Sequence, residues 1–219
     1  MVTRFMGAGL ARELRKQALD KSNGEDQDEP AVAQILYRPE GLDKLAQQTK
    51  FTRKQIQMMY RGFKQGCPVG IVNLEQFKDI YAQFFPQGDA RQYASIVFNT
   101  FDIDGNGHIS FGELVRGLSV LAHGTFEDKL SWIFALYDLE GDGQLTRDEV
   151  HTVITSIYLL MGKSTNPPIT PDTVHRHAEH VFNKLDREGT GLITIETFMD
   201  ACREDEIISL SMDSFETKL

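Results

Sequence analysis

Cysteine, tryptophan and long apolar runs are scarce in this chain of 219 residues. It has two cysteines and one tryptophan, and no apolar run approaches the length of about 18 residues that a membrane helix requires. Two cysteines give no disulfide framework, and the first residues lack the apolar core of a secretory signal. We therefore expect a protein that is not secreted and lies in a reducing, cytoplasmic setting. An apolar content of 41% still predicts a folded core.

Basic residues and enzyme motifs are also in short supply. The chain has 23 lysines and arginines against 32 aspartates and glutamates, which gives a formal net charge of −9. Such a chain repels nucleic acid unless its basic residues cluster, so no nucleic acid partner is expected. The sequence contains no nucleophile elbow, phosphate loop, H-E-x-x-H motif or kinase signature. We therefore predict that it is not an enzyme.

The segment from Asp102 to Glu113 has a pattern that is typical of calcium binding. Its sequence, D-I-D-G-N-G-H-I-S-F-G-E, matches D-x-[DN]-x-[DN]-G-x₅-E at every specified position. Calcium takes 6–8 oxygen ligands, which come from side chains at positions 1, 3 and 5, a backbone carbonyl at position 7 and a bidentate Glu at position 12. Gly107 permits the sharp turn at position 6; an ordinary surface turn is the alternative. The predicted ligands are Asp102, Asp104, Asn106, His108 and Glu113.

A second copy of the pattern starts at Asp138, 36 residues later. It has Glu140 where Asp or Asn is usual, and this longer carboxylate can still reach a cation at an altered affinity. The predicted ligands are Asp138, Glu140, Asp142, Gln144 and Glu149. We expect two calcium ions, with magnesium competing for the sites and affinities of roughly 10⁻⁷–10⁻⁵ M.

Two further copies are damaged. The copy that starts at Asp186 has Thr197 at position 12, and a Thr cannot supply two carboxylate oxygens. Its doubtful ligands are Asp186, Glu188 and Thr190. The earliest copy, residues 65–76, keeps the turn glycine Gly70 but has no carboxylate at positions 1, 3 and 5. We expect that copy to be purely structural.

Four helix–loop–helix units predict an all-α fold of two pairs. The apolar residues at position 8 should form short two-stranded bridges, Val72 with Ile109 and Leu145 with Ile193. Capping boxes predict helix starts after Thr52, Asn73, Ser110 and Thr146. The expected units are a variable N-terminal segment (1–36), a first pair (37–123), a second pair (124–206) and a C-terminal helix or tail (207–219).

Several segments outside the predicted ligands match a known family. They are Y-R-G-F-K-Q-G-C-P-V-G at residues 60–70 and I-Y-A-Q-F-F-P-Q-G-D at residues 80–89. These segments, with their Cys-Pro first loop, resemble the neuronal calcium sensor family of EF-hand proteins, whose fold is recoverin-like. Y-R-P-E-G-L at 37–42, K-F-T at 50–52 and M-G-K at 161–163 are most similar to the voltage-gated potassium channel-interacting proteins. In that subfamily the last two hands usually carry calcium, whereas here the second hand is intact and the fourth lacks its Glu.

The resemblance implies a cytosolic regulatory subunit of A-type potassium channels, held at the plasma membrane through the channel. Its members capture an apolar N-terminal channel segment in a groove, for which the candidate residues here are Tyr81, Phe84, Phe98, Leu118, Trp132, Phe134 and Tyr158. These side chains are equally compatible with an ordinary helical core. A second channel contact in the family corresponds to Leu42, Tyr60, Lys64 and Phe111.

The two ends of the chain carry their own predictions. Val2, Met6, Leu10 and Leu14, with basic neighbours, indicate a short amphipathic helix that touches a membrane, folds into the groove or remains a solvated tail. Myristoylation is not expected, because Val2 stands where Gly is required. A C-terminal helix could cover the groove, and Thr217–Leu219 weakly resembles a PDZ-domain ligand.

Alternative functions remain open at this level. The chain could be a constitutive structural subunit in which calcium only supports the fold, or a calcium buffer without a channel partner. His177 and His180 share a helix face and also permit a transition-metal site, with His175 on another face, although a solvated helix surface is the simpler interpretation.

Overall fold

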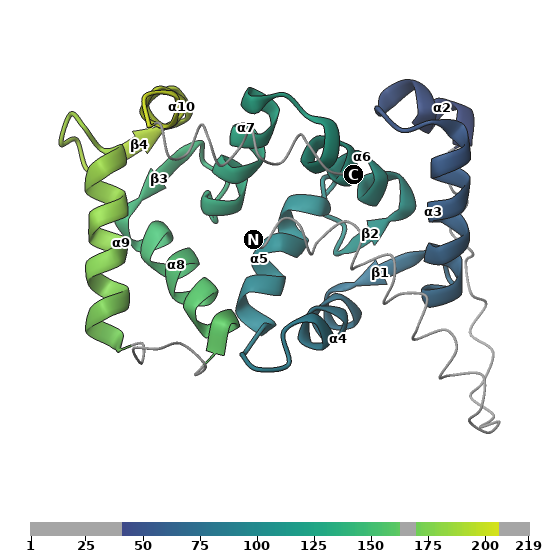
Figure 1. The fold of residues 1–219 in the computed structure, drawn as a ribbon, viewed down its shortest axis with the longest axis horizontal. Helices are drawn as coiled ribbons and strands as arrows, with labels where there is room; N and C mark the ends of the chain where they lie inside the picture. Colours follow the sequence, from purple (N-terminus) through teal and green to yellow (C-terminus); the bar gives the residue numbers. More distant parts are fainter. Residues whose placement is uncertain (1–40, 163–169, 206–219) are drawn as a thin grey trace.

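The computed structural model describes residues 41–162 and 170–205, and in these ranges helices dominate (Figure 1). The first half contains α2 (Leu42–Gln48), α3 (Arg53–Gly66), β1 (Ile71–Asn73), α4 (Leu74–Phe84), α5 (Arg91–Phe101), β2 (His108–Ser110) and α6 (Phe111–His123). The second half contains α7 (Phe126–Tyr137), β3 (Gln144–Thr146), α8 (Arg147–Met161), α9 (Pro171–Leu185), β4 (Leu192–Thr194) and α10 (Ile195–Arg203). The predicted all-α fold is confirmed.

The loops are joined in pairs by short antiparallel strands. Strand β1 pairs with β2, with Val72 opposite Ile109, and β3 pairs with β4, with Leu145 opposite Ile193. Both predicted bridges are therefore confirmed. Their central side chains are at most 3% exposed, so each bridge fastens two loops together at the edge of a core.

Local sequence signals set the helix starts. The capping boxes predicted at Thr52, Asn73, Ser110 and Thr146 are all present, each with reciprocal hydrogen bonds between the cap and the third helical residue. Thr170 caps α9, which begins with Pro171. Helix α6 ends at His123 with Gly124 as its C-cap, and Thr125 caps α7. Helix α2, by contrast, was not predicted from the sequence; it packs on α3 and α6 through the fully buried Leu45.

Each pair has its own apolar core, and the two cores meet. The first core lies among α3, α4, α5 and α6, and the second lies among α7, α8, α9 and α10. Leu136, Val153 and Leu160 belong to the first core although they come from α7 and α8. The two halves are therefore packed against each other rather than joined only by a linker.

The N-terminus of α7 provides a test of capping. Thr125 accepts from the Asp128 N–H, and the Asp128 carboxylate accepts from the Thr125 N–H. That second bond lowers the pKa of Asp128, with burial opposing and the Lys50 charge assisting. The stabilisation it gives is therefore present at neutral pH and lost as the pH falls through the lowered pKa. We expect Asp128→Asn to cost about 1 kcal/mol at neutral pH and progressively less at acid pH, as the Asp128 carboxylate of the native protein takes up its proton. Urea unfolding of both proteins at neutral and acid pH measures the difference.

Three predicted segments cannot be placed. The N-terminal amphipathic helix, the C-terminal helix over the groove and the PDZ-like end all lie outside the residues that the structure describes. None of the described helices is both long and apolar enough to cross a membrane.

Candidate metal centre

The second loop joins α5 to α6. Helix α5 ends at Phe101, Asp102 follows as its C-cap, and Ser110 caps α6. Between them Gly107 has a φ of 80°, which is the left-handed conformation that glycine adopts without strain. The chain thus turns back on itself, and positions 1 and 12 of the loop face each other.

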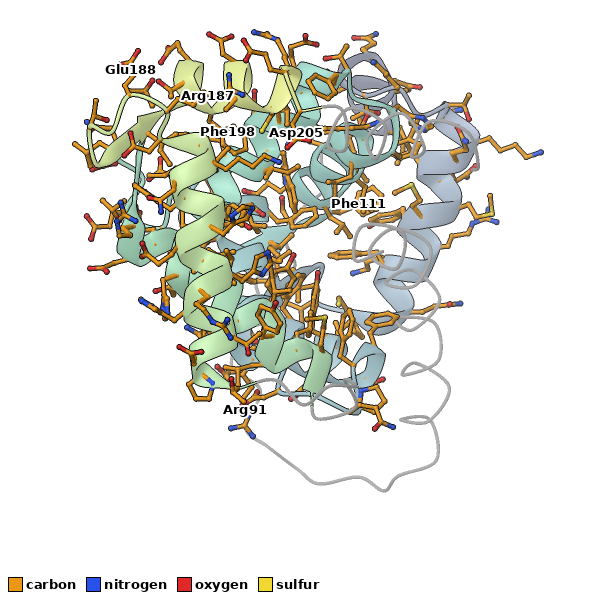
Figure 2. The ribbon with its side chains drawn as sticks, turned by 60° about the vertical axis from the view of Figure 1, so that its left-hand side comes forward. Arg91, Phe111, Arg187, Glu188, Phe198 and Asp205 are labelled. Atoms are coloured by element: carbon orange, nitrogen blue, oxygen red, sulfur yellow. The ribbon has the colours of Figure 1, made fainter. Side chains whose placement is uncertain are left out.

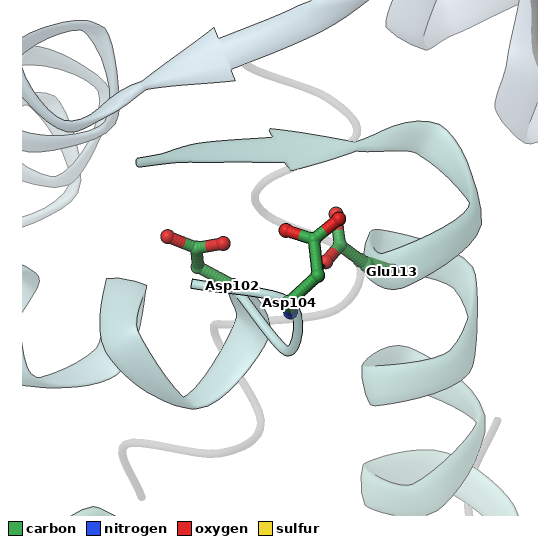
Figure 3. Close-up of side chains that lie close together, drawn as sticks. All are labelled: Asp102, Asp104 and Glu113. Carbon is green, nitrogen blue, oxygen red and sulfur yellow. Dashed lines mark hydrogen bonds between the residues drawn. The ribbon is translucent and has the colours of Figure 1, made fainter. Parts of the chain in front are cut away.

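Three carboxylates meet in this loop (Figure 3). One oxygen from each of Asp102, Asp104 and Glu113 lies within 4.8 Å of the others. Calcium binds oxygen at 2.3–2.6 Å, so two ligands of one ion lie at most about 5 Å apart, and this spacing fits a single cation. Among residues 41–162 and 170–205, no other set of three metal-ligating side chains is so close. The donors are all oxygens, which suits calcium and magnesium rather than zinc or copper.

Glu113 is held in position from both ends of the loop. One carboxylate oxygen accepts from the N–H groups of Ile103 and Asp104, at 3.1 and 3.3 Å. The other accepts from the N–H and hydroxyl of Ser110, at 2.9 and 2.7 Å. The side chain is only 5% exposed. The two remaining predicted ligands lie in the same loop, where Asn106 Oδ1 accepts from the His108 N–H at 2.8 Å.

The third loop reproduces most of this geometry. Glu149 accepts from the N–H groups of Leu139 and Glu140 and from both donors of Thr146. Burial opposes ionisation of Glu149, yet these hydrogen bonds lower its pKa, so it is a carboxylate at neutral pH. Asp138 accepts from the N–H groups at positions 4, 5 and 6 of the loop. The carboxylates of the third loop lie farther apart than those of the second loop. Position 3 of the third loop is the exposed Glu140, whose side chain is one methylene longer than that of Asp104. The other two predicted ligands, Asp142 and Gln144, are linked by a hydrogen bond from the Gln144 N–H at 2.9 Å.

The fourth loop is folded by its own hydrogen bonds. The Asp186 carboxylate accepts from the Gly191 N–H and from the N–H and hydroxyl of Thr190, and the Gly191 bond is the largest cause of its lowered pKa. Thr197 occupies the position of Glu113 and Glu149, three residues after the cap Thr194. Figure 2 shows the other predicted ligand, Glu188, beside Arg187 on this loop; Arg187 pairs with Glu204.

Restoring the missing carboxylate should restore binding. In Thr197→Glu the new carboxylate is three residues after the cap Thr194, just as Glu113 is three residues after the cap Ser110. It can therefore reach the loop. We expect one added calcium site of weak affinity, about 10⁻⁴–10⁻³ M, by isothermal titration calorimetry. Thr173→Glu is the control, because Thr173 follows the cap Thr170 in the same way but lies in α9, before the fourth EF-hand loop rather than at its position 12. An unchanged number of sites in Thr197→Glu would contradict the prediction.

In the first loop an ammonium group reaches one backbone oxygen. Lys64 Nζ donates to the Pro68 carbonyl inside the loop, and Gly70 keeps the turn with a φ of 93°. A lysine is a compact cation with three donors, so it satisfies that loop oxygen without a metal. This supports the prediction of a structural hand.

A second set of glycines was missed by sequence reasoning. Gly105, Gly141 and Gly189, at position 4 of the last three loops, have φ values of 66°, 70° and 67°. Each of these loops therefore needs two left-handed residues, at positions 4 and 6. The recurrence of glycine at the same offset was visible in the sequence, whereas the motif used specifies only position 6.

The residues predicted for a partner groove lie at two depths. Tyr81, Phe98, Leu118 and Phe134 are buried, at 2–6% exposure, and Phe84, Trp132 and Tyr158 are half-buried. In the second predicted contact, Leu42, Tyr60 and Lys64 are half-buried and Phe111 is buried. The Phe111 ring packs against the Tyr60 ring, with centroids 5.0 Å apart. Because Phe111 is buried, only Leu42, Tyr60 and Lys64 reach the surface. The surface histidines do not form a triad: His177 contacts Tyr158, and His175 contacts His151.

Comparison with protein families agrees with this site. A model of an EF-hand domain pair matches residues 109–156, and a model of a single EF hand matches residues 95–119. The matches run from α5 through the second loop and the third loop into α8, and so contain the two loops that keep the position 12 Glu. The chain therefore contains EF-hand domains, has an EF-hand fold and is a calcium-binding protein.

Proposed function

We propose that this protein is a calcium sensor that acts as a cytosolic regulatory subunit of A-type voltage-gated potassium channels. In this role it captures an apolar N-terminal segment of the channel and is peripheral to the plasma membrane through that contact. The resemblance of residues 37–42, 50–52 and 161–163 to the voltage-gated potassium channel-interacting proteins supports the partner. EF-hand families are typically non-enzymatic regulators, which agrees with the matches to residues 95–156.

The observation that carries the proposal is a pair of buried donors without acceptors. The Tyr81 hydroxyl and the Trp132 indole N–H are sealed from solvent, and neither has a hydrogen-bond partner among residues 41–162 and 170–205. Burial raises the pKa of Tyr81, so its hydroxyl keeps its proton and can donate. An unsatisfied buried polar group costs about 1–3 kcal/mol. A peptide that supplies carbonyl oxygens to these two donors would recover that free energy.

The two donors lie at the ends of a continuous aromatic ladder. Tyr81 contacts Phe77 at 5.1 Å, Phe77 contacts Phe101 at 6.4 Å, and Phe101 contacts Trp132 at 6.2 Å between ring centroids. The ladder crosses α4, α5 and α7, which belong to three different hands. Phe77 and Phe101 are buried, at 2% and 1% exposure, so an apolar helix with a few exposed carbonyls would reach these rings and donors only after the surrounding helices move apart.

Calcium can act on the ladder through α5. Phe101 is the last residue of α5 and directly precedes the first ligand, Asp102. A change in helix angle when the loop binds calcium would therefore move the Phe101 ring against Trp132. We infer that calcium changes the access of a peptide to the ladder.

The second predicted contact would form a separate binding surface for the channel. Tyr60 and Lys64 are one turn apart on α3, and Leu42 starts the neighbouring helix α2. A partly apolar, partly basic patch of this kind fits an acidic, apolar surface on a folded channel domain. Because Lys64 also donates to Pro68, its contribution depends on how far that bond persists in the complex.

Trp132 allows a direct test, because it is the single tryptophan of the chain. Peptides of a channel N-terminus are titrated into the full-length protein in calcium and in chelator, and Trp132 emission and calorimetric heat are recorded. We expect tight binding that calcium strengthens and Tyr81→Phe weakens, since Phe keeps the ring and removes the donor. Equal affinity in calcium and chelator would favour a constitutive structural subunit. Absence of binding in both would favour a calcium buffer and overturn the proposal.

A further inference from the structure

A pocket of about 380 Å³ lies at the junction of the two EF-hand pairs, away from all four loops. Its lining comes from Lys50, Ala122, His123, Gly124 and Lys129. These residues belong to the connection after α2, the end of α6 and the first turn of α7. The pocket is lined by two lysines and a histidine, whereas the protein as a whole has a net charge of −9. Its lining is therefore basic in an acidic protein.

Lys129 is the unusual member of the pocket. It is 5% exposed, and within the described residues its side chain has no hydrogen bond or ion pair. Its ammonium is not among the unpartnered atoms that are sealed from solvent, so it is reached from the pocket that the side chain lines. The Lys129 stem is therefore buried, while its ammonium faces the pocket without a hydrogen-bond partner or counter-charge among the described residues. Lysines can also bury the stem and keep the tip in water, which is the competing explanation.

Lys50 lines the same pocket and is held against α6 by two hydrogen bonds. Its N–H donates to Ser119 Oγ at 2.9 Å, and its ammonium donates to the His123 carbonyl at 2.6 Å. The His123 ring is held edge-on by Phe51, with centroids 5.0 Å apart. Lys50 and His123 are therefore positioned by the fold before any ligand binds, which lowers the entropic cost of binding.

The acidic side chains near the pocket do not cancel the positive charge of its two lysines. The Asp128 carboxylate lies near Lys50, whose charge contributes to its lowered pKa, but it is engaged in the cap of α7. Glu127 interacts instead with Arg203 of α10 at 3.7 Å. The pocket also lies at the N-terminal end of α7, a helix of 12 residues, where the helix dipole favours an anion.

We propose that Lys50, His123 and Lys129 form a binding site for a phosphate monoester. The two ammonium groups and the Asp128 carboxylate leave one net positive charge, and the oxygens of a phosphate monoester can accept from both ammonium groups at once. The volume exceeds that of one ion, so the phosphate can be part of a larger group such as an inositol phosphate. Such a ligand would join the connection after α2 to α6 and α7, and thereby brace the two EF-hand pairs.

Calorimetry of the full-length, metal-free protein tests the site with three probes. These are inorganic phosphate, soluble inositol 1,4,5-trisphosphate, and phosphatidylcholine vesicles with or without phosphatidylinositol 4,5-bisphosphate. We expect Lys129→Met to weaken binding of the soluble inositol phosphate by at least about tenfold, because it removes a charge-assisted hydrogen bond. Lys50→Met should have a similar effect without touching a buried position. Lys54→Met, at an exposed position of α3, is the charge-matched control and should bind normally.

The probes separate the possible sources of the phosphate. Binding of soluble probes alone indicates a free ligand, and a further gain on phosphoinositide vesicles indicates a lipid headgroup; both support the site if Lys129→Met removes them. The probes should also raise the melting temperature of the native protein and not that of Lys129→Met. Equal binding by Lys129→Met, Lys50→Met and Lys54→Met, or no binding of any probe, would overturn the proposal in favour of a solvated lysine tip.

Discussion

Replacing Glu113 by Gln is expected to lower the calcium affinity of the second hand by more than about 100-fold. Glu113 is the position 12 ligand, and the amide of Gln replaces one carboxylate oxygen by a donor that cannot bind a cation. Loss of groups that merely orient a ligand typically costs 10–100-fold, so loss of the bidentate ligand itself should cost more. The new NH₂ group would also face the Ile103 and Asp104 N–H groups that the native carboxylate accepts from.

Isothermal titration calorimetry provides the measurement and the controls. The native protein should bind two calcium ions, and Glu113→Gln and Glu149→Gln should each bind one. Glu196→Gln is the matched control, since Glu196 lies at the start of α10 one position before Thr197 and outside the predicted ligands. Two undiminished binding events in Glu113→Gln would show that the second loop is not a calcium site.

Gly162→Ala is expected to destabilise the protein by about 3 kcal/mol, from overpacking and left-handed strain. Gly162 ends α8 with a φ of 70°, and a Cβ there would run into the Gln87 carbonyl. The obstacle is backbone rather than the end of a flexible side chain, so it cannot easily move aside. Facing it, a Cβ on Gly88 would run into the Leu160 carbonyl. Two glycines thus permit the α4–α5 connection to lie directly on the end of α8.

Thermal and urea unfolding test this joint between the two halves. For a chain of this size about 3 kcal/mol corresponds to a melting temperature lower by roughly 10 °C. Gly41→Ala is the control, because a Cβ at Gly41 would meet nothing within 4 Å and its φ is −59°, so its effect should stay within about 0.5 kcal/mol. A neutral Gly162→Ala would mean that the hydrogen bond from the Asp89 N–H to the Leu159 carbonyl, at 2.9 Å, is not maintained in solution.

The joint has a consequence for signalling. It fixes the end of α8, the helix that leaves the third loop, to the connection between the first and second hands. A movement of α8 on calcium binding at Asp138 would therefore be transmitted to α4 and α5, which carry Tyr81 and Phe101. In a double-site titration of the native protein, this coupling would make the two calcium sites interdependent.

The sequence alone determined the helix starts, the loops and the bridges, because these depend on residues that are close in the chain. A cap and the third helical residue are neighbours, as Ser110 and Glu113 illustrate, and position 6 of a loop needs glycine whatever surrounds it. The pairing of Val72 with Ile109 followed from the same offset in two repeats. The acidic residues at fixed spacing likewise identified the second loop, where three carboxylates do meet.

Tertiary structure decided what depends on distant segments. The short helix α2 carries little pattern of its own and is fixed by burial of Leu45 against α3 and α6. The orphaned donors of Tyr81 and Trp132, the basic pocket around Lys129 and the glycine contact between Gly88 and Gly162 each join residues from separate elements. Sequence spacing fixes what one turn of helix or one loop presents. Only packing of the two halves determines which of those groups are covered, which are left without partners and which meet across the interface.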